Sequence, residues 1–168
     1  MHRIAFYPCC GGDIAEPHHA LAGIVDEIIY CDVSLVPTDN SSLGLDAPRR
    51  TFWQKDIRDG LNEISHIDVL FYRRDGTGEG GSGVFVLGKH ILPLVLEKMS
   101  GPDCLIITDG SNSRGGTFRK MKRGTGLVMD GKHVTIRPEQ RFDRLGVVEF
   151  HVRSATSFAV APTSAPTK

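Results

Sequence analysis

The chain has 168 residues, of which 40% are hydrophobic, and a chain of this size and composition can bury a continuous core in one domain. Its 20 basic and 20 acidic residues cancel, which excludes the global attraction to nucleic acids or membrane surfaces that a very basic protein has. Four cysteines are too few for a disulfide scaffold, and no apolar run approaches the ~20 residues of a membrane span. We therefore expect one cytoplasmic domain that does not associate with a membrane.

Short apolar runs alternate with amphipathic stretches through the first two thirds of the chain. Apolar spacing predicts a helix around Pro17 that extends to Val25, a second helix from Thr51 as its cap, and a third helix near 89–99. The segment 34–50 is interrupted by Pro37 and Pro48 and is predicted to be a long loop. The apolar runs predict buried strands at 3–7, 27–32, 67–72 and 103–108.

The last third of the chain has the pattern of antiparallel strands. Two short runs, 126–129 and 133–136, flank Asp130-Gly131, which is a typical two-residue hairpin turn. A final strand is predicted at 145–152, followed by a disordered tail rich in Ala, Pro, Ser and Thr.

Together these elements predict one α/β domain. Apolar strands that alternate with helices indicate a parallel sheet covered on both faces. The prediction is a Rossmann-like, three-layer domain over residues 1–153, with a mostly parallel sheet and an antiparallel strand or hairpin at its C-terminal end. Residues 154–168 form the predicted tail.

The first strand runs into the loop Tyr7-Pro8-Cys9-Cys10-Gly11-Gly12-Asp13. In parallel sheets, ligands bind at the carboxyl ends of the strands, and glycines there let the backbone approach a ligand closely. Asp32 ends the second strand about twenty residues later, where such folds place an acid on a ribose hydroxyl. This combination predicts a nucleotide-type ligand site, and the alternative is a tight turn that binds nothing.

The stretches Ile4–Asp13 and Ile28–Asp32 resemble the two cofactor-contacting strand ends of class I S-adenosylmethionine-dependent methyltransferases, and 146–152 is similar to their reversed last strand. The resemblance implies S-adenosylmethionine or a related adenosine compound as ligand, and methyl transfer to an unidentified substrate. It implies that Gly11, Gly12 and Asp13 face the methionine part of the cofactor and that Asp32 faces the ribose, with Tyr7 and Pro8 completing the loop. The compressed glycine spacing leaves a second interpretation open, a non-catalytic ligand-binding or regulatory protein on the same fold.

The segment 73–83 combines five glycines with charged side chains in eleven residues. Arg73, Arg74 and Ser82 are candidate ligands of a substrate or anion, while Asp75 and Glu79 are candidate catalytic bases or hydroxyl ligands. We expect that removing Arg73 or Glu79 weakens ligand binding without changing the melting temperature. A merely solvated loop is the alternative.

A concentrated basic segment follows the fourth strand. Between Arg114 and Arg123 there are five cations and no acid, which predicts a polyanion contact, with Arg114 as a further candidate anion ligand. A solvated connection is the alternative. No metal site is predicted, because the chain has no Cys-x-x-Cys or Cys-x-x-His pair. A third interpretation is a metal-assisted nucleotide or phosphoester hydrolase that uses Asp13, Asp75 and Asp109 at the strand ends.

Overall fold

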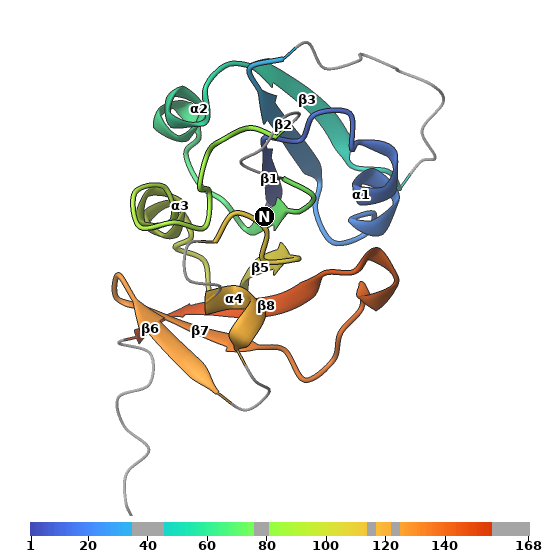
Figure 1. Cartoon of the computed structure of the whole chain (residues 1–168). Coiled ribbons are helices and arrows are strands. Elements are labelled where there is room, and N and C mark those ends of the chain that lie inside the picture. Colours follow the sequence, from blue (N-terminus) through green and yellow to red (C-terminus); the bar gives the residue numbers. More distant parts are fainter. Residues whose placement is uncertain (35–45, 76–80, 114–116, 122–124, 156–168) are drawn as a thin grey trace, which may run out of the picture.

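The computed structural model describes residues 1–34, 46–75, 81–113, 117–121 and 125–155. These residues form an α/β fold built on one eight-stranded mixed sheet in the order β3-β2-β1-β4-β5-β8-β7-β6 (Figure 1). Five neighbouring strands are parallel, namely β3 (Arg49–Gln54), β2 (Glu27–Asp32), β1 (Ile4–Pro8), β4 (Val69–Tyr72) and β5 (Cys104–Thr108).

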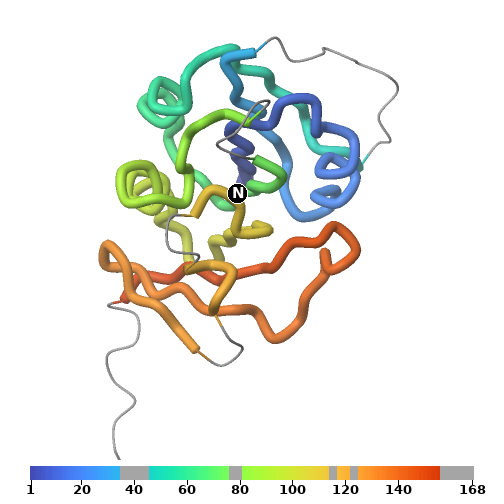
Figure 2. Tube along the Cα trace, viewed as in Figure 1, coloured from blue at the N-terminus to red at the C-terminus, as the bar shows by residue number. Residues whose placement is uncertain are grey.

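The other end of the sheet is antiparallel, as predicted. β8 (Val148–Ser154) runs against β5, β7 (Lys132–Ile136) runs against β8, and β6 (Gly126–Met129) forms the edge. Asp130 and Gly131 both have positive φ, at 48° and 71°, which is the requirement of the predicted hairpin turn. In Figure 2 the orange and red last third of the trace lies along one side of the molecule, where β8 pairs with β5.

The helices are short and leave the sheet as the dominant element. α2 (Ile57–Glu63) and α3 (Leu92–Lys98) cover one face of the sheet, and α1 (Ala15–Ala20) covers the other (Figure 1). α4 (Thr117–Lys120) adds Phe118 to the core under α2 and α3. On the α1 face, a segment around a 3-10 turn (Asp143–Leu145) completes the cover.

Two hydrophobic clusters result from the alternation of side chains along the strands. In β1, Phe6 belongs to the cluster beneath α2 and α3, whereas Ala5 and Tyr7 belong to the cluster beneath α1. Every residue of β1, β4 and β5 is buried, which is why these strands read as continuous apolar runs in the sequence.

Three predicted boundaries are wrong. Residues from Thr51 to Gln54 belong to β3 and not to a helix, because six residues pair with β2 and Thr, Phe and Trp favour a pleated strand. α2 instead begins at Ile57, with the Asp56 carboxylate accepting a hydrogen bond from the Arg58 N–H at 2.8 Å.

The other two corrections concern element ends. The predicted helix around Pro17 ends at Ala20 and does not include Val25, since the chain turns through Gly23 at φ +75°. Ser154 is the last residue of β8 and does not begin a tail. Residues 35–45 of the predicted long loop and 156–168 of the predicted tail lie outside the described residues. Within the described ranges, no helix has the length and apolar character needed to cross a bilayer.

Candidate functional site

A cleft of about 500 Å³ opens at the carboxyl ends of β1, β2, β3 and β4. From β1 the chain extends to β2 and β3 on one side and, after α2, to β4 and β5 on the other, so the strand order reverses between β1 and β4. Ligands of open α/β sheets bind at this reversal point, and clefts of 300–1,000 Å³ are typical of ligand sites. The lining residues are 9–13, 31–34, 55–57, 74, 75, 81, 82 and 84.

The glycine loop after β1 forms one wall of this cleft. Cys9 and Gly11 both have positive φ, at 53° and 52°, and the Cys9 N–H donates to the Cys31 carbonyl at 2.7 Å. A side-chain carbon placed on Gly11 or Gly12 would meet nothing within 4 Å. The backbone of both residues is therefore open to direct contact with a ligand in the cleft.

Asp32 joins the glycine loop to the end of β2. One carboxylate oxygen accepts the Gly11 N–H at 2.8 Å, and the other accepts the Ser34 N–H at 2.8 Å. The structure thus brings the predicted loop and the predicted acid into direct contact. Each carboxylate oxygen keeps a further lone pair for a hydroxyl donor in the cleft.

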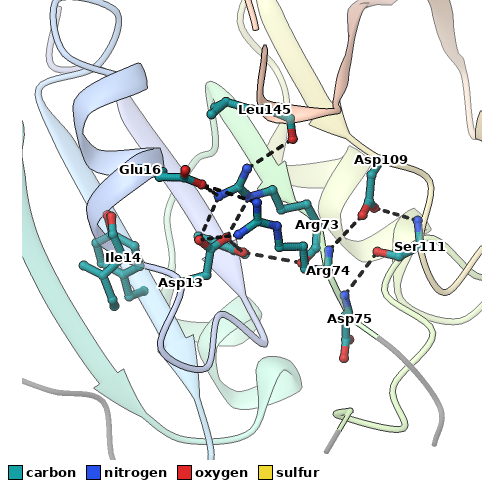
Figure 3. Close-up of polar contacts among 11 residues, drawn as sticks. Asp13, Ile14, Glu16, Arg73, Arg74, Asp75, Asp109, Ser111 and Leu145 are labelled. Atoms are coloured by element: carbon teal, nitrogen blue, oxygen red, sulfur yellow. Dashed lines mark hydrogen bonds and ion pairs between the residues drawn. The ribbon is translucent and has the colours of Figure 1, made fainter. Parts of the chain in front are cut away.

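Beside the glycine loop, Asp13 and Arg73 form a buried ion pair (Figure 3). Arg73 Nε lies 2.7 Å and Nη2 2.8 Å from the two Asp13 oxygens, and the Tyr7 hydroxyl donates to the same carboxylate at 2.7 Å. Burial alone would raise the pKa of Asp13, but the hydrogen bonds from Arg73 and Tyr7 outweigh it and lower that pKa. Asp13 is therefore an ionised structural group.

The placement of Arg73 differs from its predicted role. Its side chain has 0% exposure, and its remaining donors are taken by Glu16 at 2.6 Å and by the Leu145 carbonyl at 3.2 Å. The sequence pattern of a charged glycine-rich loop could not reveal these partners, which are 57 to 72 residues away. A guanidinium this enclosed stabilises the fold, so the structure favours a lower melting temperature on its removal, in place of the unchanged melting expected from sequence.

Arg74 differs from its neighbour because its side chain is 60% exposed and lines the cleft. Its backbone N–H donates to Asp109 at 2.9 Å, and the second Asp109 oxygen accepts the Ser111 N–H at 2.8 Å (Figure 3). Asp109 thus ties the loop after β4 to the loop after β5. Arg74 remains a candidate ligand of an anionic group.

Asp75 and Ser82 close the glycine-rich segment onto the cleft. The Asp75 carboxylate accepts hydrogen bonds from the Tyr72 hydroxyl at 2.6 Å and the Ser82 N–H at 2.8 Å, and from the Ser82 hydroxyl. These donors occupy three of the carboxylate's four lone pairs and hold it against the loop. Asp75 is therefore better suited to positioning the loop than to removing a proton.

Other predicted site residues lie elsewhere. Tyr7 and Pro8 are buried beneath the loop and are not among the residues that line the cleft. Glu79 and Arg114 lie outside the described residues. In the basic segment, Arg119 and Lys120 are exposed on α4, and nothing further in the described part tests a polyanion contact.

Three thiols lie at the cleft wall, those of Cys9, Cys10 and Cys31. Burial raises the pKa of Cys9 to about 12 and the pKa of Cys31 to about 12, and it also raises the pKa of Cys10. All three are therefore neutral near pH 7, which makes them poor nucleophiles. Over the described residues, no three His, Cys, Asp or Glu side chains come together in a way that would hold a metal ion.

Lys55 and Asp56 were missed as cleft residues, because the sequence pattern predicted a helix from Thr51. They follow β3, which brings them beside Asp32. Lys55 pairs with Glu63 at 2.6 Å and lies 4.9 Å from the centre of the Trp53 ring. The available signal was the strand-forming run Thr51-Phe52-Trp53 ahead of an acidic helix cap.

The cleft lining carries four carboxylates, Asp13, Asp32, Asp56 and Asp75, and two cations, Lys55 and Arg74. No family model and no curated protein matches this chain. The chemistry of its ligand has to be inferred from the cleft itself.

Proposed function

We propose that this chain is a Rossmann-like, methyltransferase-like domain that binds S-adenosylmethionine and transfers its methyl group to a small acceptor. The observation that carries the proposal is the hydrogen bond between the Gly11 N–H and the Asp32 carboxylate at the strand-reversal point. This bond joins an open glycine backbone to the acid that ends β2, the pair that we propose to contact the cofactor.

The charge of the cleft supports this ligand over a polyphosphate. The lining has two more acids than bases. Asp13 and Asp56 are paired with Arg73 and Arg58, and Lys55 is paired with Glu63, so Asp32 and Asp75 are the acids that attract a cationic ligand. S-adenosylmethionine carries a sulfonium, an ammonium and a single carboxylate, so its net charge is positive. ATP and dinucleotides would bring negative charge towards this surplus of carboxylates, which costs free energy in a partly enclosed site.

The topology fits the same proposal. The resemblance in sequence implies a reversed strand near the end of the chain, and β8 runs antiparallel against β5. Gly11 and Gly12 have the open space that the methionine part needs, and Asp32 has acceptor capacity for ribose hydroxyls. Arg74 is exposed at the cleft, and we assign the cofactor's carboxylate to it, in exchange for its ion pairs with Asp13 and Glu16.

Catalysis at this site would depend on positioning. When bound, the cofactor supplies an electrophilic methyl group on its sulfonium. The chain's part is to hold the acceptor in line with that carbon and to keep water out, for which well-oriented binding is sufficient. This agrees with Asp75, whose carboxylate is engaged by Tyr72 and Ser82 and holds a loop in place.

A second candidate is a ligand-binding or regulatory protein without turnover. It is favoured by one observation: Asp13 and Asp75, two acids that line the cleft, both accept internal hydrogen bonds. Binding of the cofactor without methyl transfer to any small acceptor would support this candidate over an enzyme.

Calorimetric titration with S-adenosylmethionine, S-adenosylhomocysteine and ATP tests the proposal. We expect the first two to bind, and Asp32→Asn to weaken that binding about tenfold, since one hydrogen bond to a charged group is worth ~1.5–3 kcal/mol. Asp103→Asn is the matched control, because Asp103 is exposed just before β5, at the amino ends of the parallel strands, and does not line the cleft. No binding of either sulfur compound would refute the proposal, and tighter binding of ATP would refute the charge argument.

A further inference from the structure

A second hollow of about 320 Å³ adjoins the cleft on the side of α2 and α3. Val84 lines both the cleft and this second hollow. α2 and α3 lie side by side on the same face of the sheet, and the chain that leads into α3 passes next to the carboxyl-end loops (Figure 1). A molecule in the second hollow would therefore be a neighbour of the ligand in the cleft.

The charge of the second hollow is opposite to that of the cleft. Its charged lining consists of Arg58 and Lys89, with His90 beside them, and no acid is among the described residues that line it. Lys89 and His90 are exposed, and no hydrogen bond or ion pair joins either side chain to another described residue. Arg58 pairs with Asp56 at 3.1 Å.

The Asp56–Arg58 pair marks the boundary between the two sites. Asp56 lines the acidic cleft, and Arg58, two residues later, lines the basic hollow. Because Arg58 uses one terminal nitrogen for Asp56, its other donors remain able to bind an anion. The acidic lining of the cleft and the basic lining of the second hollow therefore meet within the first turn of α2.

One part of the wall of the second hollow is apolar. Val84, Phe85 and Ile91 contribute carbon surface. Gly88 fixes their arrangement, because a side-chain carbon on Gly88 would lie 2.9 Å from Phe85 Cβ and 3.0 Å from the Phe85 carbonyl oxygen. Only glycine permits this tight turn, which places Lys89 next to the apolar wall.

We propose that this second hollow binds the methyl acceptor, and that the acceptor carries a phosphate or carboxylate group on an apolar body. The proposal rests on the proposed function for its choice of acceptor. Lys89 and His90, with Arg58, bind the anionic group by charge-assisted hydrogen bonds. Val84, shared by both sites, lies where the acceptor and the cofactor's methyl group meet.

Titration of the whole chain with phenyl phosphate and with benzoate tests this site, with phenol as the uncharged control. We expect at least one of the two anions to bind and phenol to bind at least tenfold more weakly. Lys89→Ala should weaken binding of that anion about tenfold. Arg153→Ala removes an exposed cation on β8 that does not line the hollow, and it should leave binding unchanged.

Methyl resonances locate each ligand. In NMR spectra, the methyl signals of Ile91 should shift only when the anion is added. Those of Val33, which lines only the cleft, should shift only with S-adenosylmethionine. The methyl signals of Val84 should shift with both ligands. Equal anion binding in Lys89→Ala and Arg153→Ala, or no anion binding, would overturn the acceptor site, even where S-adenosylmethionine still binds. Anion binding that depends on Lys89, in a chain that binds neither sulfur compound, would leave an anion site but refute the proposed function and with it the acceptor assignment.

Discussion

Replacing Arg73 by methionine should lower the free energy of unfolding by about 3 kcal/mol. The guanidinium is fully buried and makes two hydrogen bonds to Asp13, one to Glu16 and one to the Leu145 carbonyl. Removing one partner of a buried ion pair costs ~3–5 kcal/mol because the other charge is left without compensation. We take the lower end, since Asp13 is 17% exposed and Glu16 56% exposed, so both regain some hydration.

Arg74→Met is the matched control for this substitution. The Arg74 guanidinium lies near the same two carboxylates, 3.8 Å from Asp13 and 3.5 Å from Glu16, but it is 60% exposed. Exposed pairs contribute ~0–1 kcal/mol. Urea unfolding followed by far-UV circular dichroism should therefore place the midpoint of Arg73→Met roughly 1–2 M below that of Arg74→Met, at similar m values.

The pH dependence of the difference identifies its cause. Arg73 and Tyr7 lower the pKa of Asp13 in the folded chain, so the stability from this pair is complete above the ordinary aspartate pKa of ~3.9 and is lost as the pH falls through the folded value. The gap between wild type and Arg73→Met should narrow as the solution becomes strongly acidic. Equal stability of the two arginine variants at pH 7, or a gap that widens in acid, would refute the reasoning.

Two further predictions follow from buried groups. Burial would raise the pKa of Glu27, but hydrogen bonds from Thr51 and Arg49 lower it. Glu27→Gln should therefore lower the free energy of unfolding by ~1–3 kcal/mol at pH 7 and by progressively less below pH ~4. Urea unfolding measures this loss, and a loss that is independent of pH would contradict the reasoning. Because the pKa of Cys9 and of Cys31 is raised to about 12, both thiols should react with iodoacetamide at pH 8 roughly a thousandfold more slowly than in the unfolded chain. Mass spectrometry of the alkylated chain checks the rate, and fast labelling of the folded chain would show that these thiols are not protected.

The parallel half of the sheet could be predicted from sequence except at its edge. β1, β2, β4 and β5 are buried apolar runs, so composition alone marks them. β3 is an edge strand whose residues are only partly covered, and its apolar Phe52 and Trp53 read as the first turn of the following helix. Its assignment depends on pairing with β2, a tertiary interaction that local spacing does not contain.

The candidate site was predictable to the same degree. The contact of Gly11 with Asp32 followed from the end of one strand meeting the end of its neighbour, which the general geometry of parallel sheets dictates. The burial of Arg73 did not follow, because its partners Asp13 and Leu145 are brought to it by other parts of the chain. Local sequence marks a charged loop but not which of its charges is enclosed.

The division of charge between the two hollows connects these findings. An acidic cleft favours a cationic methyl donor, and the basic hollow beyond Val84 favours an anionic acceptor. Under the proposed function, methyl transfer removes the sulfonium charge of the donor, so the product would lose part of its attraction to Asp32 and the other carboxylates, while the anionic group of the acceptor would stay bound near Lys89. The proposal therefore predicts release of the spent cofactor after transfer: S-adenosylhomocysteine should bind the cleft more weakly than S-adenosylmethionine, by an amount that shrinks as salt screens the carboxylates.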